Sequence, residues 1–238
     1  MEKMRTYQIL EFLRQRKRCT IAELMRKFKV SSATIHRDID ELARRDAVMK
    51  VRGGLVFNEV LSMRTNGSDF NERVVTNRAD KIAAARMAFA HIREGDIIFL
   101  DSSTTVFELS VLLRKSDFAH MTIITNSVSI IQDFRKFPSH YILIGLGGGF
   151  DAQLNSFLGE TVIGHLAQLN ITKAFFSAFG LDDKNATTNH EHQAELIRKV
   201  MDSSERNYLI VDRSKLGRTG LHRLASRGAF TSIFCARR

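Results

Sequence analysis

The sequence predicts an α/β protein: an N-terminal winged helix-turn-helix domain over residues 1–57, then a mainly parallel, helix-covered α/β domain over residues 80–238. Three observations predict this fold class. Residues 20–57 show two helical patterns, a tight turn between them and a glycine-tipped hairpin. Residues 58–79 are rich in Asn, Ser, Thr and Arg and lack apolar periodicity, which is typical of a linker. From residue 80 onward, apolar runs alternate with helical patterns.

The first domain is expected to contain three helices. An amphipathic pattern predicts the first of them, with apolar residues at Ile9, Leu10 and Leu13. Thr20 and Glu23 have the spacing of a capping box, in which each side chain satisfies a backbone donor at a helix start, so a second helix should begin there. The helical pattern breaks at residues 29–31, where Ser31 can cap a third helix over residues 32–44.

The third helix has an apolar and a polar face. Ile35, Ile39 and Leu42 share one face and should pack inward. A recognition helix places its N-terminal residues against base edges in the major groove of DNA, and small residues there permit close approach. Strands at 48–51 and 55–57, joined by Arg52-Gly53-Gly54, would form a basic wing. The residues expected to contact DNA are Ser32, Ala33, Thr34, His36 and Arg37 on the helix and Lys50 and Arg52 on the wing.

The distribution of charge favours a nucleic-acid partner. Residues 1–52 contain fourteen Lys or Arg and seven Asp or Glu, so most of the formal net charge of +10 lies on less than a quarter of the chain. Basic groups concentrated on a helix-turn-helix are the electrostatic footprint of a polyanion. The alternative is a trihelical interaction module with a solvated basic face. The concentration of charge favours DNA binding over that alternative.

Composition excludes several classes. The sequence has no apolar run of membrane-spanning length and its first residues begin an amphipathic pattern, so a soluble, cytoplasmic protein is expected. Cys19 and Cys235 lie near opposite ends without metal-ligand spacing, and both are expected to be packing thiols. The sequence His190-Glu191-His192 has no third ligand at a known spacing, so these are interpreted as polar residues on the surface and not as metal ligands. No metal, cofactor or catalytic residue is predicted.

The second domain shows apolar runs that alternate with helical patterns. After a helix over residues 81–93, the runs that predict strands are 97–100, 121–125, 141–144, 174–178, 208–211 and 232–235. Strands that are apolar throughout and separated by helices imply a mainly parallel sheet covered on both faces.

Polar or small residues follow these predicted strands. They are Asp101, Asn126, Gly147, Gly180 and Asp212. Ligands of open α/β sheets bind beyond the carboxyl ends of the strands, so these residues predict a binding pocket. Ser102 to Thr105 directly precede a helix, where hydroxyls and free N–H groups bind phosphate or another anion. The alternative is that they only cap the helix, but four hydroxyl residues in a row exceed what capping needs. The glycines at 147–149 are weaker evidence, since such a cluster also forms turns.

The whole chain resembles the DeoR family of bacterial transcriptional regulators over roughly residues 5–235. The family's recognition helix reads close to S-x-x-T-I-R-R-D-L, and residues 31–39 here read SSATIHRDI, followed by Gly53-Gly54 in the wing. The sensor half of the family is similar in fold to ribose-phosphate isomerases. Its motifs D-x-G-T-T, T-N-S, L-G-G and D-x-S-K-F-G are matched here by DSSTT at 101–105, TNS at 125–127, LGG at 146–148 and DRSKLG at 212–217.

The resemblance implies a repressor of carbohydrate-catabolic genes that binds double-stranded operator DNA and is controlled by a sugar phosphate or related metabolite. Symmetric half-sites also imply at least a dimer. The residues expected to bind the effector are Asp101, Ser102, Ser103, Thr104, Thr105, Asn126, Ser127, Gly147, Gly148 and Lys215.

Four residues depart from the family pattern. His36 replaces an arginine of the recognition helix, which removes a bidentate donor and alters the expected base preference. Ser103 replaces a loop glycine, and Gln193 stands where many members have glutamate. Phe179 replaces an aspartate, so that position lacks an acid/base carboxylate, and it fills core or shapes the pocket floor. This counts against the alternative function, a sugar-phosphate isomerase with an accessory DNA-binding head, in which Lys215 would be catalytic.

Overall fold

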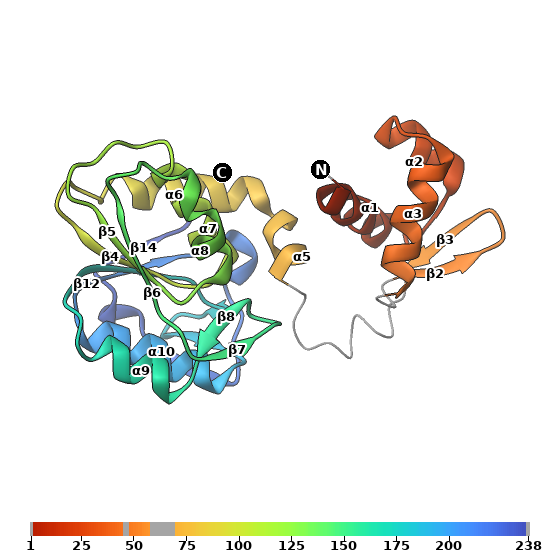
Figure 1. Cartoon of the computed structure of the whole chain (residues 1–238). Coiled ribbons are helices and arrows are strands. Elements are labelled where there is room, and N and C mark those ends of the chain that lie inside the picture. Colours follow the sequence, from red (N-terminus) through yellow and green to blue (C-terminus); the bar gives the residue numbers. More distant parts are fainter. Residues whose placement is uncertain (1, 45–47, 58–69, 237–238) are drawn as a thin grey trace. The chain divides into compact units, whose positions relative to one another are not determined.

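A computed structural model of the chain describes residues 2–44, 48–57 and 70–236, which form two compact units, Met1–Thr76 and Asn77–Arg238 (Figure 1). The described residues of the first unit form three helices and a three-stranded antiparallel sheet of order β1-β3-β2, followed by a short helix. Its elements are α1 (Glu2–Arg16), β1 (Arg18–Thr20), α2 (Ile21–Phe28), α3 (Ser32–Arg44), β2 (Val48–Val51), β3 (Gly54–Phe57) and α5 (Phe70–Val75). The predicted winged helix-turn-helix fold is therefore confirmed.

The start of α2 is fixed by the predicted capping box. The Thr20 hydroxyl accepts a hydrogen bond from the Glu23 amide at 3.2 Å, and the Glu23 carboxylate accepts one from the Thr20 amide at 2.8 Å. At the other end Lys29 adopts a left-handed conformation with φ of 53°, which turns the chain toward α3. Ser31 then caps α3 by accepting from the Thr34 amide at 3.3 Å. The capping residues therefore set the length of the turn between the two helices.

A buried ion pair joins α1 to α3. The guanidinium of Arg5 donates to both carboxylate oxygens of Asp38, at 2.6 and 3.0 Å, and the Asp38 side chain is only 1% exposed. Ile9 and Leu13 of α1 pack into the same apolar core as Ile35. Because a bidentate pair has a defined geometry, Arg5 and Asp38 fix the rotation of α3 about its own axis. That rotation decides which face of α3 is exposed.

The segment predicted to be a linker, residues 58–79, is partly helical. Residues 58–69 lie outside the described residues. Phe70 is buried at the start of α5, and α6 (Arg78–Phe89) begins two residues before the predicted domain boundary at 80. Asn77, with φ of 52°, separates the two helices and marks the division between the compact units. Helix α5 has only six residues, which is too few to show a helical period in the sequence.

The second unit is built on a six-stranded sheet in which every recorded strand pair is parallel, in the order β14-β12-β9-β4-β5-β6. The predicted parallel sheet is thus confirmed. Its strands and helices are β4 (Ile97–Leu100), α7 (Thr104–Leu113), β5 (Thr122–Thr125), α8 (Val128–Asp133), β6 (Ile142–Gly145), α9 (Glu160–Leu166), β9 (Ile171–Phe176), α10 (Glu191–Asp202), β12 (Ser204–Ile210) and β14 (Ser232–Phe234).

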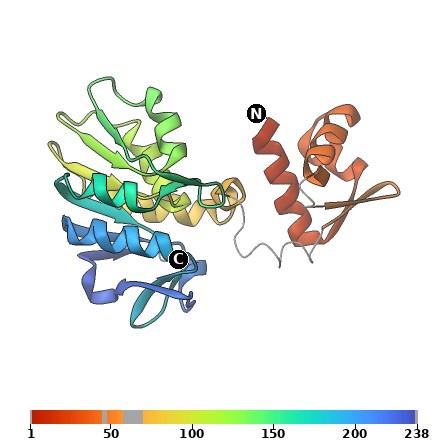
Figure 2. The ribbon, with the colours of Figure 1, turned by 60° about the horizontal axis from the view of Figure 1, so that its bottom comes forward.

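Helices cover both faces of this sheet (Figures 1 and 2). On one face Ala84 of α6, Val106 of α7 and Ile130 of α8 belong to one apolar core. On the other, Val162 of α9 and Leu196 of α10 belong to a second core. Because both faces of the sheet are buried, its strands are apolar throughout.

Two small antiparallel elements escape the sequence patterns. One is the hairpin of β7 (Gly149–Asp151) and β8 (Ser156–Leu158), and the other is a sheet of β10 (Gly180–Leu181), β11 (Asn185–Thr188) and β13 (His222–Ser226). These strands are two to five residues long and carry Asn, Thr, Ser and Gly. Segments this short and polar show neither period clearly, so sequence reasoning leaves them as loops.

No helix among the described residues is long and apolar enough to cross a membrane. Both cysteines are free thiols. Burial, with a smaller contribution from the Glu23 carboxylate, raises the pKa of Cys19 to about 11, and burial likewise raises the pKa of Cys235. Cys19 belongs to the core of the first unit and Cys235 packs against a core of the second, which confirms that both are packing thiols.

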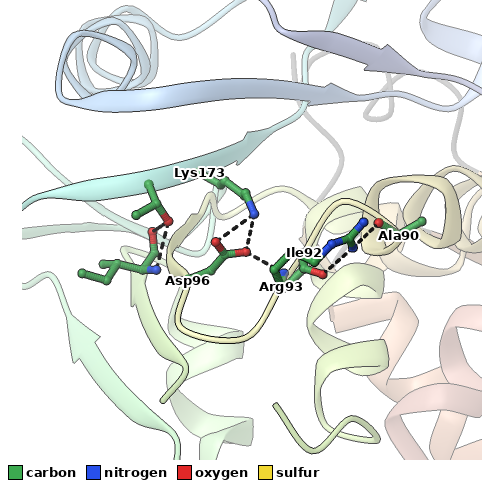
Figure 3. A network of polar contacts seen from close by, with 7 residues as sticks. Ala90, Ile92, Arg93, Asp96 and Lys173 are labelled. Atoms are coloured by element: carbon green, nitrogen blue, oxygen red, sulfur yellow. Dashed lines mark hydrogen bonds and ion pairs between the residues drawn. The ribbon is translucent and has the colours of Figure 1, made fainter. Parts of the chain in front are cut away.

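A buried ion pair also lies next to the amino end of β4. The ammonium group of Lys173, within β9, donates to both oxygens of Asp96 at 2.8 and 2.6 Å, and each side chain is 10% exposed. Asp96 also accepts from the backbone amide of Arg93 at 2.7 Å, so it joins the turn after α6 to β9 (Figure 3). β4 and β9 are neighbours in the sheet, with Ile98 opposite Lys173. The pair therefore ties the turn before β4 to the adjacent strand.

We predict that Lys173→Met lowers the free energy of unfolding of the second unit by about 3–5 kcal/mol, because it leaves the Asp96 carboxylate buried without its counter-charge. The double variant Lys173→Met with Asp96→Asn should recover part of this loss, since asparagine keeps an acceptor for the Arg93 amide without a charge. Urea unfolding followed by circular dichroism measures both. Equal losses in the single and double variants would contradict the assigned role of the charge.

Candidate functional site

The exposed face of α3 carries the predicted recognition residues. Ser32, Ala33, His36 and Arg37 are exposed, whereas Ile35 on the opposite face is fully buried. Among the described residues, no hydrogen bond or ion pair is formed by the side chains of His36 or Arg37, and both side chains are exposed to a partner. A helix with small residues at its start and donors further along has the form of a major-groove reader.

Thr34 lies at the edge of this face. It is half-buried, and its hydroxyl lies 3.0 Å from that of Ser31 at the helix cap. The Thr34 hydroxyl therefore takes part in the turn. Thr34 is less accessible to a base than the four exposed residues.

The wing places Lys50 and Arg52 differently. Arg52 is exposed at the turn between β2 and β3, where Gly53 has φ of +80°. Lys50 is exposed as well, but its ammonium group forms an ion pair with Asp40 of α3. A phosphate group would therefore compete with Asp40 for Lys50, while Arg52 has no recorded partner among the described residues. Gly54 is required because a Cβ atom there would lie 2.3 Å from the carbonyl oxygen of Cys19 on β1.

In the second unit, the residues predicted to bind an effector follow parallel strands. Asp101 to Thr105 follow β4, Asn126 and Ser127 follow β5, Gly147 and Gly148 follow β6, and Lys215 lies in the short helix η2 (Arg213–Lys215) that follows β12. Since all these strands are parallel neighbours, or separated only by β9, their carboxyl ends lie at one edge of the sheet. The structure therefore brings the predicted residues to the same edge.

Asp101 holds the first loop in place. One carboxylate oxygen accepts from the Ser103 amide at 2.8 Å and the other from the Ser177 amide at 2.9 Å, and the side chain is buried. Ser177 directly follows β9, so Asp101 links the loops that leave two neighbouring strands. Both oxygens are used within the protein, and the role of Asp101 in this structure is to shape the loop.

The hydroxyl loop divides into a cap and free groups. Ser103 is the N-cap of α7, with its hydroxyl accepting from the Val106 amide at 3.2 Å. Among the described residues, no hydrogen bond is recorded for the hydroxyls of Ser102, Thr104 and Thr105. The first-turn amides of a helix also have no acceptor within the helix. One serine therefore suffices as the cap, and the other three hydroxyls and the amides of Thr104 and Thr105 retain donor capacity.

Asn126 and Ser127 are more constrained. The Asn126 amide group donates to the Ser156 hydroxyl at 2.6 Å and to the Phe157 carbonyl at 3.1 Å, which fastens the end of β5 to β8. Its carbonyl oxygen is buried with no partner among the described residues. Ser127 is buried, and its hydroxyl accepts from the Ile130 amide at 3.5 Å at the start of α8. The unpartnered oxygen of Asn126 is the group left to accept a further hydrogen bond.

The two glycines after β6, Gly147 and Gly148, lie in different surroundings. A Cβ atom at Gly148 would lie 2.6 Å from Cγ2 of Val162, so only glycine allows α9 to pack this closely. Gly147 is exposed, and a Cβ atom there would meet nothing within 4 Å. Packing therefore explains Gly148, whereas nothing in the structure requires a glycine at 147.

Residues after β12 and β9 supply the charged part of the edge. Asp212 is buried, one of its oxygens accepts from the Ser214 amide at 3.0 Å, and the other has no partner among the described residues. The Lys215 ammonium lies 5.8 Å from the ring centroid of Phe179. The guanidinium of Arg218 lies 4.3 Å from the same centroid. Phe179 is half-buried and belongs to neither apolar core, so it lines this edge.

Sequence reasoning missed Arg218. It falls outside every motif, and its contact with Phe179 depends on tertiary structure. Asp212 was recognised as a strand end but not as the holder of a free buried oxygen. Gln193, at the fourth departure from the family pattern, accepts from the Thr188 hydroxyl at 2.6 Å and so holds the start of α10 to β11.

The described residues contain no group of His, Cys, Asp and Glu that could hold a metal ion. His192 lies 3.2 Å from Glu195 within α10, on an exposed face. Glu191 and His192 are exposed polar residues, as expected, whereas His190 is half-buried.

Comparison with known proteins identifies both units. The family model described as the DeoR-like helix-turn-helix domain matches residues 5–60, and that of the DeoR C terminal sensor domain matches residues 76–236. The HTH-type transcriptional regulator IolR of Bacillus subtilis is 30% identical over 93% of this chain and 86% of its own. The L-fucose operon activator of Haemophilus influenzae is 31% identical, over 96% and 90% respectively. The transcriptional repressor GlcR of Bacillus subtilis is 29% identical, over 91% and 81%.

Among solved structures, a D-ribose-5-phosphate isomerase in complex with phospho-erythronic acid aligns with a TM-score of 0.41 at 17% identity, over 57% of this chain and 52% of that chain. A likeness at this level assigns neither a fold nor an activity.

We predict that Asp101→Ala destabilises the second unit by about 2–6 kcal/mol, because the amides of Ser103 and Ser177 each lose a charged acceptor in a buried place. Asp183→Ala, which changes an exposed carboxylate, should leave stability within about 0.5 kcal/mol. Urea unfolding of both variants provides the measurement. Matching stabilities for the two would show that Asp101 does not hold the loop.

Proposed function

The chain belongs to the DeoR family of transcriptional regulators, and from this membership we propose that it represses carbohydrate-catabolic genes and is released from its operator by a phosphorylated sugar. The observation that carries the proposal is that one chain joins an exposed recognition helix to a parallel sheet whose polar strand ends gather at one edge. The named relatives are transcriptional regulators, which favours a regulator over an enzyme. They include an activator, so the sign of regulation is part of the proposal.

We propose that α3 reads base edges through Ser32, Ala33, His36 and Arg37, with Thr34 at the margin. An arginine donates two parallel hydrogen bonds to guanine, whereas an imidazole offers at most one donor in the same direction. His36 therefore contributes a narrower preference than Arg37. The wing contacts phosphates through Arg52, and through Lys50 once it leaves Asp40.

We propose that the effector binds at the strand ends of the second unit. The free hydroxyls of Ser102, Thr104 and Thr105, together with the amides of Thr104 and Thr105 at the start of α7, suit a phosphate group. Lys215 adds a positive charge, and the unpartnered oxygen of Asn126 suits a sugar hydroxyl. Asp101, Ser103 and Ser127 hold the loops, Gly148 keeps α9 close, and Gly147 leaves the backbone open to the ligand.

The proposed regulator acts as a dimer or larger oligomer, since a single small head has weak affinity and paired half-sites require paired heads. The effector changes operator affinity only if it binds one arrangement of the heads better than another. The cytoplasm, where both DNA and sugar phosphates are present, is the proposed location.

We predict that Arg37→Ala lowers operator affinity by about 1–3 kcal/mol, because it removes a base-reading donor from an exposed helix face. The operator is first selected from random DNA duplexes by the wild-type protein, and affinity is then measured by fluorescence anisotropy at fixed salt. Arg86→Ala, which removes an exposed arginine from α6 in the second unit, is the matched control. Unchanged affinity in Arg37→Ala would contradict the assignment of α3.

We predict that at least one sugar phosphate raises the midpoint of thermal unfolding and weakens operator binding. A ligand at a hundred times its Kd stabilises the native state by about 2.7 kcal/mol. A panel of hexose and pentose phosphates is tested beside the corresponding unphosphorylated sugars. A sugar phosphate that strengthens operator binding would reverse the proposed sign, and the absence of any effect across the panel would contradict the sensor proposal. Conversion of an aldose phosphate to its ketose by the purified protein would instead favour the isomerase.

A further inference from the structure

Two cations share one aromatic ring at the edge of the sheet where the effector is proposed to bind. Phe179 lies in the segment that follows β9. The ammonium group of Lys215 lies 5.8 Å from the centroid of its ring, and the guanidinium group of Arg218 lies 4.3 Å from the same centroid. Attraction between a cation and an aromatic face holds the guanidinium in place without neutralising its charge. A carboxylate at position 179 would neutralise it, whereas phenylalanine cannot.

The backbone of Arg218 is fixed by its surroundings. Gly180 has no side chain, and a Cβ atom there would lie 2.1 Å from the Arg218 carbonyl oxygen, so the loop rests directly on β10. On either side of Arg218, the Gly217 amide donates to the Leu181 carbonyl at 2.9 Å and the Gly220 amide donates to the Thr187 hydroxyl at 2.7 Å. The loop that carries Arg218 is therefore joined at several points to the small antiparallel sheet.

The charge of Arg218 has no counter-ion in the described part of the chain. The carboxylate that contacts this loop is Asp182, which accepts from the amides of Lys184 and Asn185 at 2.8 and 2.7 Å and from the Thr219 hydroxyl at 3.1 Å. No ion pair is recorded between Asp182 and Arg218. An arginine held by a ring, on a fixed loop and without a paired carboxylate, is prepared for an external anion.

We propose that Arg218 is a ligand-binding residue that, together with Lys215, grips the phosphate group of the effector, and that Phe179 positions it. Guanidinium groups bind phosphate through two parallel hydrogen bonds, and a second cation distinguishes a phosphate dianion from a neutral sugar or a monoanion. The inference rests on the proposed function and deepens it, because it names the residues that would select the doubly charged phosphate group of the effector.

The test uses inorganic phosphate as the probe for the full chain. Apparent affinity is measured by thermal unfolding across a phosphate titration, with sodium chloride at equal ionic strength as the reference. Arg218→Gln should weaken phosphate binding about tenfold or more, because a charge-assisted hydrogen bond is lost. Arg218→Lys should recover part of the affinity through its charge alone. Lys184→Gln, which removes an exposed lysine on the turn before β11, should leave affinity unchanged.

Phe179→Leu tests the positioning role. Leucine keeps the apolar character but lacks the aromatic face, so phosphate affinity should fall several-fold while Arg218 is still present. Unfolding midpoints without phosphate separate this effect from a general loss of stability.

The outcomes separate the role of Arg218 from the proposed function as a sugar-phosphate sensor. Equal phosphate affinity in the wild type and Arg218→Gln overturns the inference alone, because Lys215 and the α7 loop would then suffice. A wild-type protein that phosphate does not stabilise overturns the inference and the phosphate part of the proposed function together. Operator affinity without phosphate should be the same in Arg218→Gln and the wild type, and a large loss would mean that Arg218 acts on DNA binding instead.

Discussion

Parallel hydrogen bonding among six strands is the constraint on which the second unit depends. Once β12, β9, β4, β5 and β6 run in the same direction, every chain segment that leaves a strand at its carboxyl end emerges at one edge. Helices must return the chain across the faces, which explains the two separate apolar cores. Because the apolar cores lie on the two faces of the sheet, the edge at the carboxyl ends of the strands can hold polar groups that do not take part in the cores.

In the first unit, an ion pair and not a sheet determines which side chains are exposed. The bidentate pair of Arg5 and Asp38 sets the rotation of α3, so that the residues beside Asp38 point outward. His36 and Arg37 owe their exposure to this arrangement. In both units, buried polar groups that have hydrogen-bond partners fix the position of nearby side chains that have none among the described residues.

Local patterns predicted what local physics determines. The capping box at Thr20, the buried face of α3 and the apolar strands of the parallel sheet could all be read from spacing within one element. The pairing of Lys50 with Asp40, the inward-facing Asp101 and the contact of Arg218 with Phe179 could not, since each joins segments that only the folded chain brings together. The candidate site was thus predicted in outline, by its loops, and not in the roles of single residues.

The absence of a side chain at Gly180 has a consequence for how this protein can diversify. A methyl group there would displace the backbone of the Arg218 loop, so drift at position 180 would disturb several contacts at once. Phe179 and Arg218 contact each other through their side chains, with 4.3 Å from the guanidinium to the ring centroid. In the proposed site, a library built to change ligand preference would therefore randomise positions 179 and 218 and keep the glycine at 180.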